Sequence, residues 1–327
     1  MNLRFVALPE IDLDDRSFEI RKFALPLRLQ ESLARFGILD PPWLREKGGQ
    51  PIVVDGFKRL RWAKESGVPG TVCRIFPGTC DDRELWTLRI EKRLFESGID
   101  IAEKAQIIST LLRLFQPGEI PGFFPASLNV ANRPEFLRKW ASLAARGTKT
   151  LEILALGAIA ERAALEVADW DESSMNAVLA ILESLRCSAS IQVEIVERIT
   201  EIALRYGKER SEIIENPRTL EILASKELNH RQKTQALRNF LAELRYPRLS
   251  SRQKRFGFEV QSLGLSSRVR IIPPPAFEGD NWKMELSFTG PEGLREILGS
   301  AASVARSGRL DAILEPRPHQ AKDEQSR

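Results

Sequence analysis

The apolar positions of the first hundred residues switch between two periods. Two short runs rich in β-branched residues, 51–55 (PIVVD) and 71–76 (TVCRIF), are bounded by Gly and Pro and predict strands. The segment between them, FKRLRWAKESG, has apolar residues on one side and stops at Gly67, which predicts a helix and therefore a βαβ unit. An earlier helix, in LPLRLQESLARFGI, is predicted to end at Gly37.

The helical period then continues from residue 100 to residue 245. Apolar residues recur there at three- and four-residue spacings, with breaks at 117–125 and around 169–173. This pattern predicts an all-helical region made of one or two bundles.

The pattern changes again after residue 250. Strands are predicted near 268–272 and 283–288, followed by a helix that begins near Pro291. The last residues, RPHQAKDEQSR, are almost without apolar side chains and are expected to be disordered. The predicted fold class is α+β and predominantly helical. The expected parts are an N-terminal α/β domain (1–98), a helical region (99–248), a small C-terminal α/β element (249–315) and a disordered tail (316–327).

The composition argues against a secreted or membrane protein and against zinc sites and disulfides. No run of about 18 uncharged apolar residues occurs, and the first residues carry acids where a signal peptide is apolar, so we expect a cytoplasmic protein without membrane contact. Three cysteines without a CxxC pair and only two histidines argue against a zinc site and against disulfides.

The charges are unevenly distributed along the chain. Residues 151–204 contain three Arg or Lys against ten Asp or Glu, whereas residues 205–256 contain thirteen basic against six acidic residues. Such asymmetry is typical of a protein that presents one basic surface to a polyanion. Solvated helix faces are the alternative explanation.

The segment VVDGFKRLRWA is the sharpest chemical feature of the sequence. A glycine at a strand-to-helix junction lets backbone N–H groups approach a ligand closely, and the N-terminus of the helix favours an anion. Lys58 and Arg59 follow Gly56 in the first turn, where cations are normally unfavourable. This arrangement indicates an anion site, with a solvated turn as the simpler alternative.

Three segments together resemble a known family. The order LQESLARFGILDPPWL, PIVVDGFKRLRWAKESGVPGTVCRIF and RIEKRLFESGIDIAEKAQII is similar to the N-terminal domain of the ParB family over about residues 5–115. In that family a Gly-x-Arg-Arg turn binds the phosphates of CTP, CTP closes the protein into a clamp on DNA, and a helix-turn-helix reads the partition site. The resemblance implies phosphate contacts for Gly56, Lys58 and Arg59, with Arg21 and Glu91 as further nucleotide-binding positions.

The sequence also departs from the family pattern. Phe57 stands where the family usually has an acid, and Lys58 replaces an arginine, which loses bidentate phosphate geometry. Residues 91–95 (EKRLF) match the family's Glu-Asn-Leu-Gln-Arg motif only at Glu91. CTP with magnesium is the cofactor that the resemblance implies, while these departures count against magnesium binding and nucleotide hydrolysis.

A domain of this shape also occurs in sulfiredoxins and in a few kinases and nucleases. Sulfiredoxin chemistry needs a cysteine in the phosphate turn, and GFKR has none; Cys73 is predicted to be a small core residue. A phosphotransferase or nuclease would use Glu91, Glu96 or Asp55 as a general base or metal ligand. An assembly module that binds no nucleotide is the third alternative.

The best candidate for reading DNA is the stretch 105–146. The segment FFPASLNVAN fits the first helix and turn of a helix-turn-helix, and Asn132 with Glu135 predicts a capping box for the recognition helix RPEFLRKWASLAAR. Its predicted DNA-binding cations are Arg133, Arg138, Lys139 and Arg146, with Lys149 just beyond.

The opposite face of this helix, formed by Phe136, Leu137, Trp140 and Leu143, is predicted to be buried. An amphipathic helix packed in a bundle without DNA remains an alternative, because basic helix faces are common. The stretch HRQKTQALRNFLAELRYPRLSSRQKRF could contact phosphates as well, or could be a helical hairpin or a protein interface.

The sequence therefore predicts a ParB-like DNA-binding protein switched by a nucleotide, in chromosome or plasmid partition or in transcription control. Expected partners are DNA, the nucleotide, a second copy in a homodimer, and a partition ATPase. We expect the protein in the cytoplasm, associated with the nucleoid.

Overall fold

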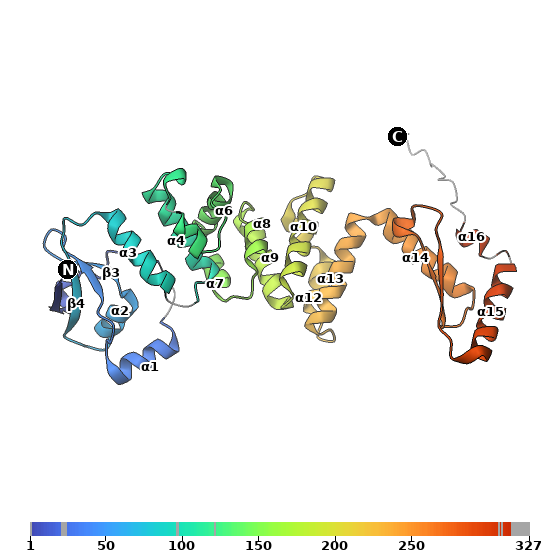
Figure 1. Cartoon of the computed structure of the whole chain (residues 1–327), viewed down its shortest axis with the longest axis horizontal. Coiled ribbons are helices and arrows are strands. Elements are labelled where there is room, and N and C mark those ends of the chain that lie inside the picture. The colour runs from blue at the N-terminus through green and yellow to red at the C-terminus, as the bar shows by residue number, and fades with distance from the viewer. Residues whose placement is uncertain are drawn as a thin grey trace. The chain divides into compact units, whose positions relative to one another are not determined.

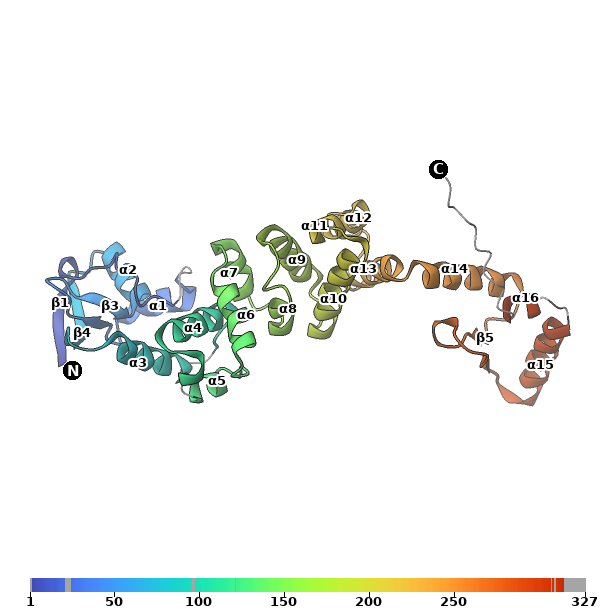
Figure 2. The ribbon, with the colours of Figure 1, turned by 90° about the horizontal axis from the view of Figure 1, so that it is seen from above.

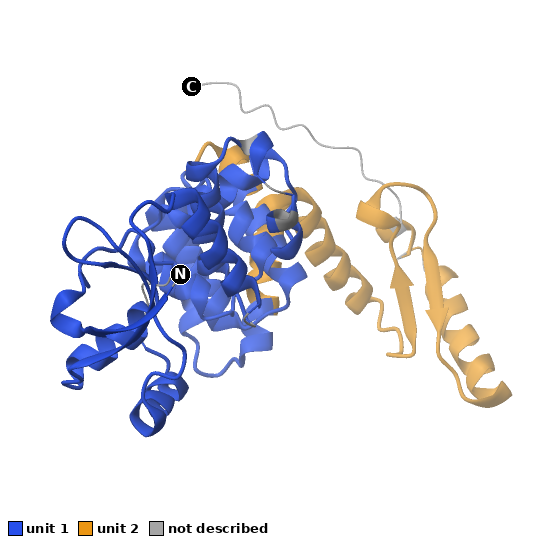
Figure 3. Cartoon of the chain, turned by 60° about the vertical axis from the view of Figure 1, so that its left-hand side comes forward, with its two compact units in different colours: residues 1–200, 209–234 blue, residues 201–208, 235–327 orange. Residues whose placement is uncertain are grey.

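The structure is a computed structural model, and it describes residues 2–20, 25–95, 98–120, 122–306, 308 and 310–314. Arg21 and the tail predicted at 316–327 lie outside the described residues. The chain forms two compact units, coloured separately in Figure 3: residues 1–200 with 209–234, and residues 201–208 with 235–327. Most of the described chain is helical and a small sheet is mixed, so the predicted α+β class is confirmed.

A four-stranded sheet organises the N-terminal part of the first unit. Its strands are β1 (Asn2–Ala7), β2 (Trp43–Arg45), β3 (Ile52–Asp55) and β4 (Gly70–Phe76), in the order β1-β4-β2-β3. The β2 strand pairs parallel with β4 and antiparallel with β3, while β1 pairs antiparallel with β4. Strands β3 and β4 confirm the two predicted runs.

The predicted strand, helix and strand are present, but the two strands do not run parallel, so they do not form the predicted βαβ unit. Helix α2 (Phe57–Glu65) does connect β3 to β4, but β2 lies between these strands, and β3 runs antiparallel to β2. The reason is that β2 has only three residues, WLR, too short to show a period-two pattern, yet it hydrogen-bonds to both neighbours.

Three helices accompany this sheet at the blue end of the chain in Figure 1. They are α1 (Leu27–Phe36), α2 and α3 (Asp82–Phe95). Helix α1 ends as predicted, because Gly37 adopts φ 68° and its N–H donates to the Leu33 carbonyl. The core between sheet and helices contains side chains with no exposed surface: Leu44, Val53, Val54, Leu60, Ala63, Cys73, Leu85 and Ile90.

The helical period from residue 100 to residue 245 is confirmed. Helix α4 packs against α6 and α7, and α9 packs against α7 and α11, all within the first unit (Figure 2). The predicted break at 169–173 separates α8 from α9. The helices are α4 (Ile101–Leu114), α5 (Phe123–Ser127), α6 (Pro134–Ala144), α7 (Thr148–Ala155), α8 (Glu161–Glu166), α9 (Glu172–Leu185), α10 (Ala189–Tyr206), α11 (Arg210–Ile214), α12 (Pro217–Ala224) and α13 (His230–Arg245).

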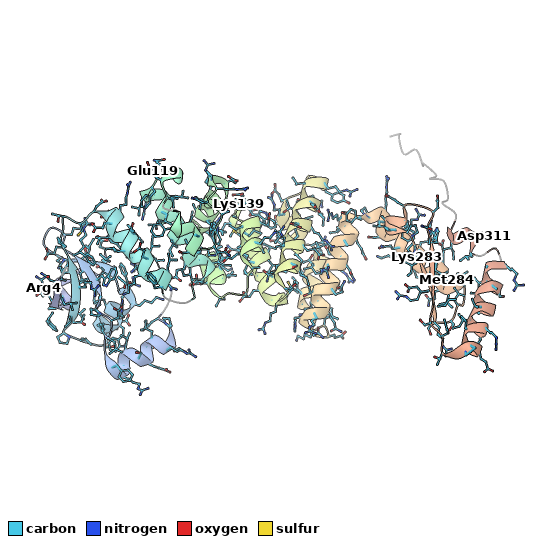
Figure 4. All side chains as sticks on the ribbon, viewed as in Figure 1. Arg4, Glu119, Lys139, Lys283, Met284 and Asp311 are labelled. Carbon is cyan, nitrogen blue, oxygen red and sulfur yellow. The ribbon has the colours of Figure 1, made fainter. Side chains whose placement is uncertain are left out.

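The second unit ends in a small α/β element, where both predicted strands and the predicted helix are present. An antiparallel hairpin of β5 (Val269–Ile272) and β6 (Lys283–Leu286) follows α14 (Pro247–Ser262) and precedes α15 (Gly290–Arg306) and α16 (Asp311–Leu314). The residues Lys283 and Met284 mark β6 in Figure 4. Among the described residues, no helix has the length and apolar content that a bilayer crossing requires.

Candidate functional site

The junction between β3 and α2 has the backbone that an anion site needs. Gly56 is the N-cap of α2 with φ 93°, a left-handed conformation that side chains disfavour. A Cβ atom at this position would lie 2.9 Å from Cβ of Pro42, so the close approach of the loop before β2 also requires glycine. No side chain caps the helix, and its first turn presents Lys58 and Arg59.

A cavity of about 400 Å³ opens beside this turn. Part of its lining is apolar and includes Ile20 together with Leu29 and Leu33 of α1. Six charged side chains of the lining, called the charged end below, come from the loop before β2, the end of β3, the start of α2 and one face of α3. These are Asp40, Asp55, Lys58, Arg59, Arg89 and Lys92.

Asp55, the last residue of β3, lies at the centre of the charged end. Its Oδ2 accepts hydrogen bonds from Nη2 of Arg59 at 3.0 Å and from Nζ of Lys92 at 2.7 Å, and its Oδ1 accepts one from Nη1 of Arg89. Burial by itself raises the pKa of Asp55, but the three cations outweigh it and hold that pKa well below its usual range. Asp55 is therefore a fixed anion.

Asp40 forms a second, more exposed layer of the same network. Its Oδ2 accepts a hydrogen bond from Nζ of Lys92 at 2.8 Å and another from Arg59, which also donates to the Asp40 backbone carbonyl at 2.5 Å. The Asp40 side chain is 56% exposed, against 18% for Asp55. Burial raises the pKa of Asp40, and the hydrogen bond from Lys92 and the charge of Arg59 lower it to a net value below the usual range.

The cavity lining carries a small excess of positive charge. It contains five cations and four carboxylates: Lys58, Arg59, Arg89, Lys92 and Arg93, and Glu19, Asp40, Asp55 and Glu103. In addition, the Arg89 side chain is only 10% exposed, and its Nε is buried without a hydrogen-bond acceptor. Buried donors without acceptors are costly, and the arrangement therefore favours an anion with several oxygen atoms.

Two further ion pairs connect the cavity wall to its surroundings. Arg93 of α3 donates to both oxygens of Glu103 on α4, at 2.5 and 2.8 Å, and the Glu103 side chain is 1% exposed. Glu19 accepts a hydrogen bond from Arg61 of α2 at 2.7 Å. The Arg93–Glu103 pair joins the α/β part directly to the helical part, and both of its members line the cavity.

The structure brings together only part of the predicted nucleotide-binding set. Gly56, Lys58 and Arg59 line one cavity, whereas Glu91 of α3 is not among the lining residues and Arg21 is outside the described chain. Sequence reasoning missed Arg89 and Lys92 as cavity residues. Their spacing at i and i+3 on one helix places them on a common face, and this is the signal that could have found them.

Cys73 has the environment of a core residue. It lies in β4 with no exposed surface, and burial raises the pKa of its thiol to about 11, against a smaller lowering effect of Arg59. A thiol in this state is a poor nucleophile, which agrees with its predicted structural role.

The candidate DNA helix is α6, and its N-terminus differs from the prediction. The helix begins at Pro134, its N-cap is Arg133, and no side chain caps it, so the predicted capping box of Asn132 and Glu135 is wrong. Proline at the first helical position requires an extended residue before it, and this places the cap at Arg133. The short helix α5 precedes α6 in the position expected for the first helix of the motif.

The predicted buried face of α6 is mostly confirmed. Leu137, Trp140 and Leu143 are at most 2% exposed, and the ammonium of Lys104 on α4 lies 5.3 Å from the ring centre of Trp140. Phe136 is 39% exposed, because one residue along a helix turns the side chain by about 100° away from its neighbour's face.

The predicted DNA-binding cations fall into two groups. Arg133, the N-cap of α6, and Arg138 of α6 are exposed, Lys149 is exposed on α7, and Lys139, labelled in Figure 4, is partly exposed. Arg146 instead donates a hydrogen bond from Nη2 to the Ala168 carbonyl, which anchors the end of α6 to the segment after α8.

Comparisons with known proteins give no sequence match: no family model and no curated protein matches the chain. Among solved structures, it is similar to the C-terminally truncated chromosome-partitioning protein ParB from Caulobacter crescentus complexed to the centromeric parS site. The TM-score is 0.34 at 14% identity, over 60% of this chain and 99% of that chain. A second structure of that protein, complexed with CTP-gamma-S, has a TM-score of 0.25 at 16% identity, over 62% of this chain and 100% of that chain. One of these structures of ParB contains DNA and the other contains a CTP analogue. At these TM-scores and identities the similarity is no argument for the function of this chain.

Proposed function

We propose that this chain is a ParB-like DNA-binding protein whose cavity beside Gly56 binds the phosphates of a nucleotide. The charged end of the cavity is the observation that carries the proposal. Arg59, Arg89 and Lys92 bind Asp55 or Asp40 there, beside a glycine turn that opens a helix N-terminus, and Lys58 lines the same cavity. The family resemblance of the sequence makes CTP the first nucleotide to test.

The cavity has the division of surface that nucleotides require. Its apolar lining residues Ile20, Leu29 and Leu33 suit a base and a ribose, while its cationic side chains suit phosphates. The volume of about 400 Å³ is within the range of small-molecule sites.

DNA binding is assigned to α6 in this proposal. Arg133, Arg138 and Lys139 supply the cations, and the buried face formed by Leu137, Trp140 and Leu143 positions them on the helical region. The proposal includes a homodimer and an association with the nucleoid, in partition or in transcription control. A partition ATPase is the protein partner to test.

The enzyme alternative has less support at this site. The carboxylates that line the cavity in the described chain are Glu19, Asp40, Asp55 and Glu103, and each accepts a hydrogen bond from an arginine or a lysine. A general base must be free to accept a proton and must have a pKa close to the working pH, and Asp55 meets neither condition.

The test is equilibrium binding of labelled CTP, with ATP and GTP as competitors, to the wild type and to Arg59→Ala. The matched control is Lys64→Ala, which removes an exposed cation of the same helix outside the cavity. We expect selective CTP binding, weakened at least tenfold in Arg59→Ala because charge-assisted hydrogen bonds contribute about 1.5–3 kcal/mol. Absence of binding by any of the three nucleotides would overturn the nucleotide part of the proposal.

A further inference from the structure

Lys92 forms ion pairs with two of the carboxylates that line the cavity, Asp40 and Asp55. Its ammonium lies 2.7 Å from Oδ2 of Asp55 and 2.8 Å from Oδ2 of Asp40, and 4.8 Å from the ring centre of Trp43. The side chain is 22% exposed and lines the cavity. The positive charge of Lys92 is thus fixed at the charged end by contacts with Asp55, Asp40 and Trp43.

A magnesium ion does not fit beside Asp55 and Asp40. Mg²⁺ requires nearly octahedral coordination by oxygen atoms at about 2.0–2.1 Å. Both oxygens of Asp55 and Oδ2 of Asp40 already accept hydrogen bonds from cations. Within the part of the chain that the structure describes, no group of three or more His, Cys, Asp or Glu side chains has the arrangement to hold a metal.

The surrounding charges add to this misfit. Any metal ion placed beside Asp55 would stand within a few ångströms of Arg59, Arg89 and Lys92. Repulsion between like charges at about 4 Å is weak in water and several times stronger at a partly buried site. A divalent cation doubles each of these terms.

We infer that the phosphate site works without a divalent cation, because Lys92 supplies the positive charge that magnesium supplies in other nucleotide sites. The inference rests on the proposed function and specifies its chemistry. The ligand is the free, metal-less nucleotide anion. Its oxygen atoms accept hydrogen bonds from Arg59, Arg89 and Lys92, while Asp55 keeps these three cations in place.

The experiment compares CTP affinity in excess EDTA with CTP affinity in excess Mg²⁺, using the full chain. We expect the two dissociation constants of the wild type to agree within about twofold. In Lys92→Met, which keeps the length of the side chain and removes its charge, affinity in EDTA is expected to fall about tenfold or more. In Lys92→Arg, which keeps the charge, most of the affinity is expected to remain. The control Lys64→Met, at an exposed position outside the cavity, is expected to bind as the wild type does.

The outcomes separate this inference from the proposed function. Binding that appears only with Mg²⁺ would overturn the metal-free site and leave nucleotide binding intact. Binding in EDTA that is unchanged in a folded Lys92→Met would overturn the role of Lys92. No binding in either buffer would overturn the proposed function, and the inference with it. The comparison of the two buffers uses only the wild type, so it decides the metal question even if Lys92→Met does not fold.

Discussion

Asp55 is expected to stabilise the α/β part by pairing with three cations, and Asp55→Asn tests this directly. The substitution keeps the size of the side chain but removes the anion that Arg59, Arg89 and Lys92 share, so that Arg59 and Lys92 keep only the exposed Asp40. Removal of one partner from a buried ion pair costs about 3–5 kcal/mol, because the remaining charge is desolvated and unpaired. The side chains of Asp55, Arg59, Arg89 and Lys92 are between 10% and 22% exposed, so some solvent remains.

We therefore expect a loss near the lower limit, about 3 kcal/mol of unfolding free energy. For a unit of this size each kcal/mol lowers the melting temperature by about 2–4 °C, so the loss corresponds to roughly 6–12 °C. The assay is urea unfolding followed by circular dichroism, with Asp82→Asn as the matched control. Asp82 also pairs with an arginine, Arg45, but is 62% exposed, so its loss is expected to cost less than about 1 kcal/mol.

The pH dependence of the unfolding free energy is a second, independent test of this role of Asp55. The pKa of Asp55 is lower in the folded chain than in the unfolded chain, where it is about 3.8. Its stabilising contribution is therefore fully present above that value and is lost as the pH falls toward the folded pKa. The gap in unfolding free energy between wild type and Asp55→Asn should stay constant from pH 7 to about pH 5 and shrink at lower pH. Equal stability of the two proteins at pH 7, or a gap that grows in acid, would refute the assigned role.

Three other predictions concern the cavity, the DNA helix and the core. Asp40→Asn should tighten CTP binding about two- to fivefold, since it frees cations from an exposed competitor, and a calorimetric titration that shows weaker binding would count against competition. Replacing Arg138 and Lys139 together by Ala should reduce the slope of log affinity for DNA against log salt by about 2, measured by fluorescence anisotropy, and an unchanged slope would exclude phosphate contacts by these residues. Cys73 in the native chain should react with iodoacetamide at pH 8 much more slowly than in urea, and rapid labelling would show that the thiol is not buried as described.

The sequence by itself determined most of the local structure. The runs at 52–55 and 70–76 form strands because β-branched residues favour extended backbone, and the glycines at 37 and 56 bound helices because each adopts a positive φ. The helical period after residue 100 and the strand–loop–strand–helix pattern after residue 268 were equally readable. Within the candidate site, the same local logic identified Gly56, Lys58 and Arg59, which are neighbours in the chain.

Only the tertiary structure decided how these parts combine. The order of the strands depended on β2, three residues whose pairing, rather than their period, makes them a strand. Asp40 and Lys92 are 52 positions apart, and nothing local in either segment indicates that a hydrogen bond of 2.8 Å joins them. Periodicity shows which face of an element is buried, but the partner of a charged side chain is set by packing of distant segments. For that reason the sequence predicted an anion site, while the structure showed that the protein's own Asp55 and Asp40 already neutralise part of its charge.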